Sequence, residues 1–199
     1  MHERKEMTNN RLYSRRELTK LGGLGLLASS FTPLLSSFAD SQKKFVEPAG
    51  TAYQGTDEKL LDEIQRTSFD FFWFEASAKT GQVKDRALAN GNDTRAMSSI
   101  AATGFGLTSL CIGDHRGFGP SKEILERVRS TLRFLANDLH HEHGFYYHFI
   151  HMETGERWDK TELSSIDTSL LLCGVLTARQ YFADQEIKDL ATKIYERVD

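Results

Sequence analysis

Two helical segments that are apolar on almost every side limit the possible folds of this chain most strongly. The run 97–112 (MSSIAATGFGLTSLCI) carries no charge and is rich in Ala, Gly and Ser, and the first turns of 165–182 are also apolar all round. The segments around them, about 57–78, 121–138 and 184–198, have apolar residues along one face only. Helices of the first kind are buried and helices of the second kind are half-buried. The sequence therefore predicts an all-α fold with the second and fourth helices inside.

Alternation of half-buried and buried helices favours two layers, as in an αα-toroid, because every helix of a plain four-helix bundle would be amphipathic. Short connections make successive helices antiparallel neighbours. The long polar loops 79–95 and 139–164 are then expected on one face, where chemistry would take place. Five helices do not close a ring, and the chain stops at Asp199 inside a predicted helix with no stop signal. We infer the N-terminal part of a larger toroid.

The N-terminal segment is predicted to be an export signal. Ser14 to Lys20 contains a twin-arginine pair, which is followed by the apolar run 21–35 and a small-residue end at Ala39. The alternative is a retained anchor, but the apolar run is shorter than the ~20 residues of a spanning helix. We expect a signal peptide over 1–39, a linker over 40–56 and the toroid domain over 57–199. The partner of the signal would be the twin-arginine machinery, and the mature chain would be periplasmic or secreted, without a stable membrane span.

Composition argues against nucleic-acid binding. The net charge is −3 and no basic stripe is present, which suits a neutral substrate.

The two cysteines, Cys111 and Cys173, both lie in apolar helical runs, where buried free thiols are expected. A disulfide is chemically allowed outside the cytoplasm.

The segment from His143 to Gly174 contains the best candidates for chemistry. Its first half can form a hairpin that turns at Thr154-Gly155, and its second half is the fourth helix. Glu162 and Asp167 flank the start of that helix and are the candidate catalytic carboxylates, a general acid and a general base. Asp167 also has a structural alternative, because Ser164 to Asp167 fits a capping box. Glu162 could equally be a solvated loop charge.

Further residues of the same face could bind a sugar. Aromatic side chains can stack on sugar rings, although alternation along a hairpin would point about half of them inward. Asp85 and Arg86 could bind hydroxyl groups, fix a catalytic carboxylate or form only an exposed ion pair. Asp159 has the same ambiguity. The candidate substrate-binding residues are Asp85, Arg86, Tyr146, Tyr147, His148, Arg157, Trp158 and Asp159.

A metal site is not predicted. His140, His141, His143, His148 and His151 lie close together in the sequence, but their spacing matches no tight zinc motif. No phosphate-binding glycine loop is present either, because Gly104 and Gly106 lie within an apolar helix.

Several ordered motifs resemble the bacterial glycoamylase-like family, which includes the endo-β-1,2-glucanases of glycoside hydrolase family 144. They are FDFFWFEA (69–76), Asp85-Arg86, SSIAATGFGLTSL (98–110), GFYYHF (144–149), METGER (152–157) and ELSSIDTSLLL (162–172). The resemblance covers about 57–199 and implies an (α/α)6 toroid, inverting hydrolysis and no obligatory cofactor. It supports Glu162 and Asp167 as site residues. His151 stands where many relatives have an Asp.

We therefore expect a hydrolase of β-glucan, with β-1,2-linked glucan as the first choice of substrate and an oligo- or polysaccharide as the partner. A glycan-binding or polysaccharide-assembly protein without turnover, on the same fold, is the alternative. A polysaccharide lyase is a weaker third reading.

Overall fold

The computed structural model describes residues 53–88 and 93–199, and the compact unit begins at Tyr53. Its helices are α2 (Asp57–Phe74), α3 (Ile100–Arg116), α4 (Ser121–Asn137), α5 (Ser165–Tyr181) and α6 (Gln185–Glu196). Its strands are β1 (Met97–Ser99), β2 (Tyr146–Tyr147), β3 (Phe149–His151) and β4 (Leu163–Ser164). None of the described helices is long and apolar enough to cross a membrane. The predicted export signal and most of the predicted linker lie outside the described residues, so they stay predictions.

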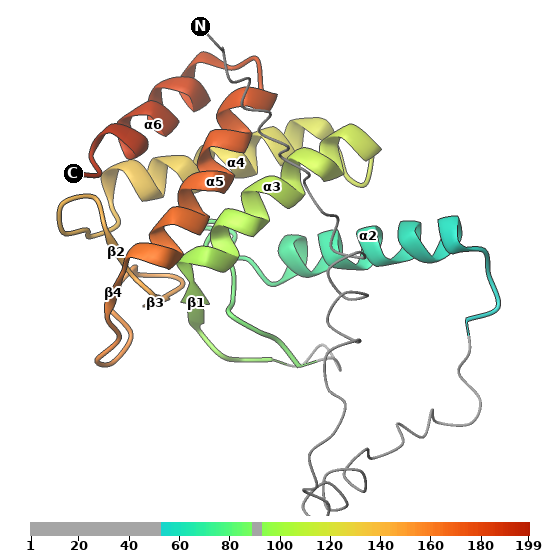
Figure 1. Ribbon diagram of the computed structural model, residues 1–199, viewed down its shortest axis with the longest axis horizontal. Helices are drawn as coiled ribbons and strands as arrows, with labels where there is room; N and C mark the ends of the chain where they lie inside the picture. Colours follow the sequence, from blue (N-terminus) through green and yellow to red (C-terminus); the bar gives the residue numbers. More distant parts are fainter. Residues whose placement is uncertain (1–52, 89–92) are drawn as a thin grey trace, which may run out of the picture. The chain divides into compact units, whose positions relative to one another are not determined.

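The two apolar helices lie side by side at the centre, as predicted. Figure 1 shows α3 and α5 next to each other, both starting beside the short strands, with α2, α4 and α6 around them. Gly104 and Gly174 make this approach possible, since a Cβ atom built on Gly174 would lie 2.0 Å from the carbonyl oxygen of Gly104. The inner helices therefore touch backbone to backbone.

The outer helix α4 is amphipathic and covers the core with one face. Its residues Ile124, Val128, Leu132 and Leu135 are fully buried at helical spacing. Pro120 is its N-cap residue, without a side-chain hydrogen bond. Proline suits this place because the first backbone N–H groups of a helix have no partner inside it.

Burial of the inner helices is less complete than predicted. Phe105 of α3 and Ile166 of α5 are 55% and 67% exposed, and Cys173 of α5 is exposed while Cys111 is buried. Leu61 and Ile64, two apolar residues of α2, are exposed as well. Helix periodicity shows which residues are apolar, but burial requires an element packed closely against that side, and Ile64 and Phe105 instead line an open groove between α2 and α3.

The strands differ from one simple hairpin. The predicted turn is present: Gly155 has φ of 75°, and its N–H donates to the His151 carbonyl at 2.8 Å. One isolated antiparallel bridge, between Ile150 and Arg157, joins the two segments on either side of this turn. The longer pairings are not those of a hairpin, since β3 pairs with β1 and β2 pairs with β4.

The last helix, α6, ends at Glu196, so Asp199 lies outside the helix. The Asp199 N–H donates to the His143 carbonyl at 3.2 Å.

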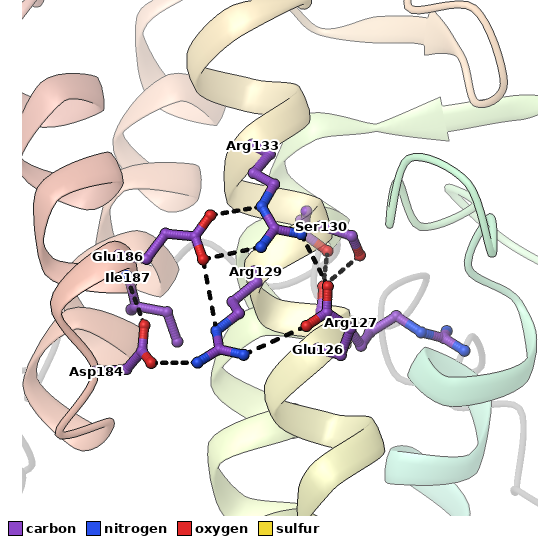
Figure 2. Close-up of polar contacts among 9 residues, drawn as sticks. Glu126, Arg127, Arg129, Ser130, Arg133, Asp184, Glu186 and Ile187 are labelled. Carbon is purple, nitrogen blue, oxygen red and sulfur yellow. Dashed lines mark hydrogen bonds and ion pairs between the residues drawn. The ribbon is translucent and has the colours of Figure 1, made fainter.

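A network of charges joins α4 to the start of α6 (Figure 2). Arg133 binds both carboxylate oxygens of Glu186, at 2.5 and 2.8 Å, and Arg129 donates to Asp184 at 2.5 Å. Glu126 contacts both guanidinium groups. Asp184 also caps α6 by accepting from the Ile187 N–H. The hydrogen bond from Arg133 lowers the pKa of Glu186, and that from Arg129 lowers the pKa of Asp184.

This network predicts a loss of stability in acid. A carboxyl group with a lowered pKa in the folded state stabilises it above the unfolded pKa of about 4, and that contribution is lost as pH falls through the folded value. Glu186→Gln should lower the melting temperature at pH 7 by on the order of 2 °C, and the difference should shrink as pH falls below about 4. Thermal unfolding between pH 7 and pH 3 measures this. Glu196→Gln, an exposed carboxylate of the same helix outside the network, is the control, and the same loss in both variants would contradict the prediction.

Candidate functional site

The two long polar loops meet at the N-terminal ends of the inner helices. The β1–β3 pairing aligns Met97 with His151 and Ser99 with Phe149. The first loop joins the same sheet, because the Asp85 N–H donates to the Met97 carbonyl and the Ser99 N–H to the Val83 carbonyl. For the described residues, these backbone contacts confirm the prediction that the loops 79–95 and 139–164 share one face.

The centre of this face holds two carboxylates on either side of one imidazole. His148 lies between β2 and β3. Its Nδ1 is 3.0 Å from Oε1 of Glu162, and its Nε2 is 3.5 Å from Oδ1 of Asp167. Both predicted catalytic residues are thus brought together, but through a side chain that the sequence indicated only as a sugar contact.

Asp167 is held in place by the start of α5. Its N–H donates to Ser164 Oγ at 3.2 Å, and the Ser164 hydroxyl donates to Asp167 Oδ2 at 2.5 Å. The predicted cap at Ser164 is therefore present, although the carboxylate of Asp167 binds the hydroxyl of Ser164 rather than its backbone. The side chain of Asp167 is only 13% exposed.

Glu162 is open to solvent, with its side chain 66% exposed. A backbone hydrogen bond from its own N–H and then the contact with His148 lower the pKa of this carboxyl group. Its second oxygen accepts from the Thr161 hydroxyl at 3.4 Å. The free chain therefore presents Glu162 as an ionised and accessible carboxylate near neutral pH.

Aromatic rings and a guanidinium lie on the same segment. The Arg157 guanidinium stands 4.6 Å from the centre of the Tyr147 ring, within cation–π distance, and its Nε donates to the Thr161 carbonyl at 2.7 Å. The exposed Trp158 ring stacks on His151, with 6.2 Å between the ring centres. These side chains could contact a sugar.

The prediction that Tyr146 binds the substrate is wrong. This residue is fully buried, and its hydroxyl donates to the Leu135 carbonyl at 3.3 Å. Alternation along β2 points Tyr146 into the core and leaves Tyr147 partly exposed. A buried ring cannot stack on a sugar.

Of the remaining predicted binding residues, Asp85 and Arg86 pair with each other at 2.5 Å, with Arg86 largely exposed. This geometry is the exposed ion pair that the sequence also suggested. Asp159 is exposed and has φ of 47°, a left-handed conformation that Asp tolerates in turns.

The chain is similar to known proteins in sequence and in structure. No family model matches the chain. Over 148 residues it is 32% identical to an exo β-1,2-glucooligosaccharide sophorohydrolase (non-reducing end) of Parabacteroides distasonis, and the match covers 71% of this chain and 20% of that protein. An endo-β-1,2-glucanase from Chitinophaga pinensis, solved with sophorotriose and glucose, is similar in structure, with a TM-score of 0.64 and 25% identity over 72% of this chain. The chain therefore resembles the β-1,2-glucan hydrolases of the bacterial glycoamylase-like family.

This glycoamylase-like chain spans only part of its relatives. It covers 36% of the Chitinophaga glucanase, and 22% of a β-1,2-glucanase structure from Parabacteroides distasonis, to which it is 30% identical with a TM-score of 0.61. The five helices with two inside are the corresponding part of the αα-toroid of these glucanases, which confirms the predicted fold class. Over the described residues, no group of three or more His, Cys, Asp or Glu side chains could hold a metal ion.

Sequence reasoning missed how His148 connects the site. Its position in the run of aromatics predicted a sugar contact, whereas the chain breaks its strand there and turns the imidazole between the carboxylates. Glu162 lies 14 residues away and Asp167 lies one helical turn past Ser164, so no local spacing indicates this contact. The pairing of β2 with β4 decides it.

Proposed function

We propose that the glycoamylase-like chain forms part of a glycoside hydrolase that acts on β-glucan, most specifically on β-1,2-linked glucan. The observation that carries this proposal is the exposed Glu162 carboxylate, held by His148 next to Asp167 at the start of an inner helix. The relatives named above, which act on β-1,2-glucan or its oligosaccharides, support the choice of linkage.

The proposed reaction is an inverting hydrolysis by two carboxyl groups. One group, protonated, gives its proton to the glycosidic oxygen as the bond from that oxygen to the sugar C1 breaks. The other group, ionised, takes a proton from the water that bonds to C1 from the opposite side. In the free chain the His148 ring lies between the two carboxyl groups, with Nδ1 3.0 Å from Glu162 and Nε2 3.5 Å from Asp167.

The two carboxyl groups differ in access to a sugar. Glu162 is exposed, and a glucan that covered it would remove water from it and raise its pKa, which suits proton donation. Asp167 is mostly covered and its Oδ2 accepts from the Ser164 hydroxyl, which suits a fixed group that orients a water molecule. Tyr147, Arg157 and Trp158 would bind the glucan beside Glu162.

Incubation of the full chain with linear β-1,2-glucan tests the proposal. We expect binding, detected by calorimetry, and new reducing ends that accumulate with time, while β-1,3- and β-1,4-glucans give neither. Binding without new reducing ends would instead support the alternative of a glycan-binding or assembly protein. Absence of both would overturn the proposal for this chain.

A further inference from the structure

The turn 157–161 leads the chain from one short sheet to the other. At its start, the Trp158 N–H donates to the carbonyl of Phe149 in β3 at 3.0 Å. Just beyond its end, Leu163 of β4 pairs with β2. Glu162 stands between the turn and β4, so the conformation of the turn sets where its carboxylate lies.

The side chain of Arg157 closes this turn. Its Nε donates to the Thr161 carbonyl at 2.7 Å, and its guanidinium carbon lies 4.6 Å from the centre of the Tyr147 ring on β2. One planar group therefore binds the end of the turn and lies on the strand that pairs with β4, a combination that arginine suits because its donors and its flat face act together.

The other side chains of the turn do not hold its end. Trp158 stacks on His151 instead. Asp159 has φ of 47°, a conformation that a residue other than glycine keeps only where surrounding contacts hold it. Lys160 is exposed, and within the described part of the chain it has no hydrogen bond or ion pair.

The contacts of Glu162 depend on where the turn ends. Its Oε1 is 3.0 Å from His148 Nδ1, its Oε2 accepts from the Thr161 hydroxyl at 3.4 Å, and its carbonyl accepts from the His148 N–H at 3.0 Å. After the hydrogen bond from its own N–H, the contacts with His148 and Thr161 also lower the pKa of Glu162. A turn that opened would move both partners away from this carboxylate.

We propose that Arg157 is a positioning residue that holds Glu162 beside His148 by closing the turn 157–161. Only the Nε of Arg157 forms a hydrogen bond within the described part of the chain, so its two terminal amino groups can still donate to a glucan. The effect of this positioning on turnover rests on the proposed function, whereas the positioning itself exists without substrate.

Arg157→Met tests the positioning in the free chain, because methionine keeps an apolar stem beside Tyr147 and removes the guanidinium. Carbon-13 NMR of the carboxyl groups should show a raised pKa of Glu162, since its contacts with His148 and Thr161 loosen. The His148 amide should exchange its hydrogen on the order of 10-fold faster, because its acceptor is the Glu162 carbonyl.

Lys160→Met is the matched control, since it removes the same charge from the same turn without removing a hydrogen bond. It should leave the His148 amide exchange unchanged and shift the pKa of Glu162 less than Arg157→Met does. Amide spectra check that both variants fold, which is expected because both side chains are exposed. Equal effects of the two substitutions would overturn the proposal.

Turnover of linear β-1,2-glucan separates positioning from sugar binding. Arg157→Met should lower turnover at saturating glucan on the order of 10- to 100-fold, because a misplaced catalytic group loses its alignment with the bond. A weaker affinity with wild-type saturated turnover, pKa of Glu162 and amide exchange would mean that Arg157 only binds sugar, and would overturn the proposal. If the NMR changes occur but even the wild-type chain hydrolyses nothing, only the proposed function is overturned.

Discussion

Gly174→Ala is expected to be the most destabilising of the substitutions considered for this chain, by about 3 kcal/mol. The added Cβ would lie 2.0 Å from the carbonyl oxygen and 2.6 Å from the carbonyl carbon of Gly104. Both are backbone atoms within the first turns of α3, so no side chain can move aside, and the inner helices would have to separate. For a chain of this size the loss corresponds to a fall in melting temperature of about 6–12 °C.

Thermal unfolding followed by circular dichroism measures the effect. Cys173→Ala is the matched control, because this exposed neighbour on the same helix has no close packing to lose and should change stability by less than about 0.5 kcal/mol. Equal melting temperatures for the two variants would show that α3 and α5 do not approach as closely as described.

Glu162→Gln is expected to reduce the turnover of linear β-1,2-glucan about 10²- to 10⁴-fold, the range attributed to one acid or base group. The amide has the same shape as the carboxylate but cannot exchange a proton at neutral pH. Because the side chain is 66% exposed, folding and glucan binding should remain close to wild type. The measurement compares the release of reducing ends at saturating glucan with the binding constant.

Glu156→Gln provides a control for this experiment, since it removes an exposed carboxylate of the same loop that contacts only Thr154 among the polar partners described. It should leave turnover unchanged. Wild-type turnover by Glu162→Gln would remove Glu162 from the reaction. The pH dependence assigns its role: a base loses activity as pH falls through the pKa of Glu162, and an acid loses activity as pH rises through it.

Much of the candidate site was predictable because short patterns of neighbouring residues indicate its positions. Ser164 and Asp167 carry a cap pattern that depends on four consecutive residues, and the structure contains that cap. Glu162 was indicated by its place before a buried helix. Tyr146 was assigned wrongly because alternation states that neighbouring side chains point to opposite sides, but not which side is the core.

The sequence by itself determined the helix types, since periodicity of apolar residues depends only on neighbours one or two turns apart. This periodicity predicted which two helices are inside, which face of α4 is buried and that both long loops lie on one face. Only the tertiary structure decided that β3 pairs with β1 and β2 with β4, and that His148 lies between Glu162 and Asp167. These contacts join residues that are far apart in the chain. No short-range sequence pattern predicts these contacts, because the partner of each strand or side chain comes from another segment.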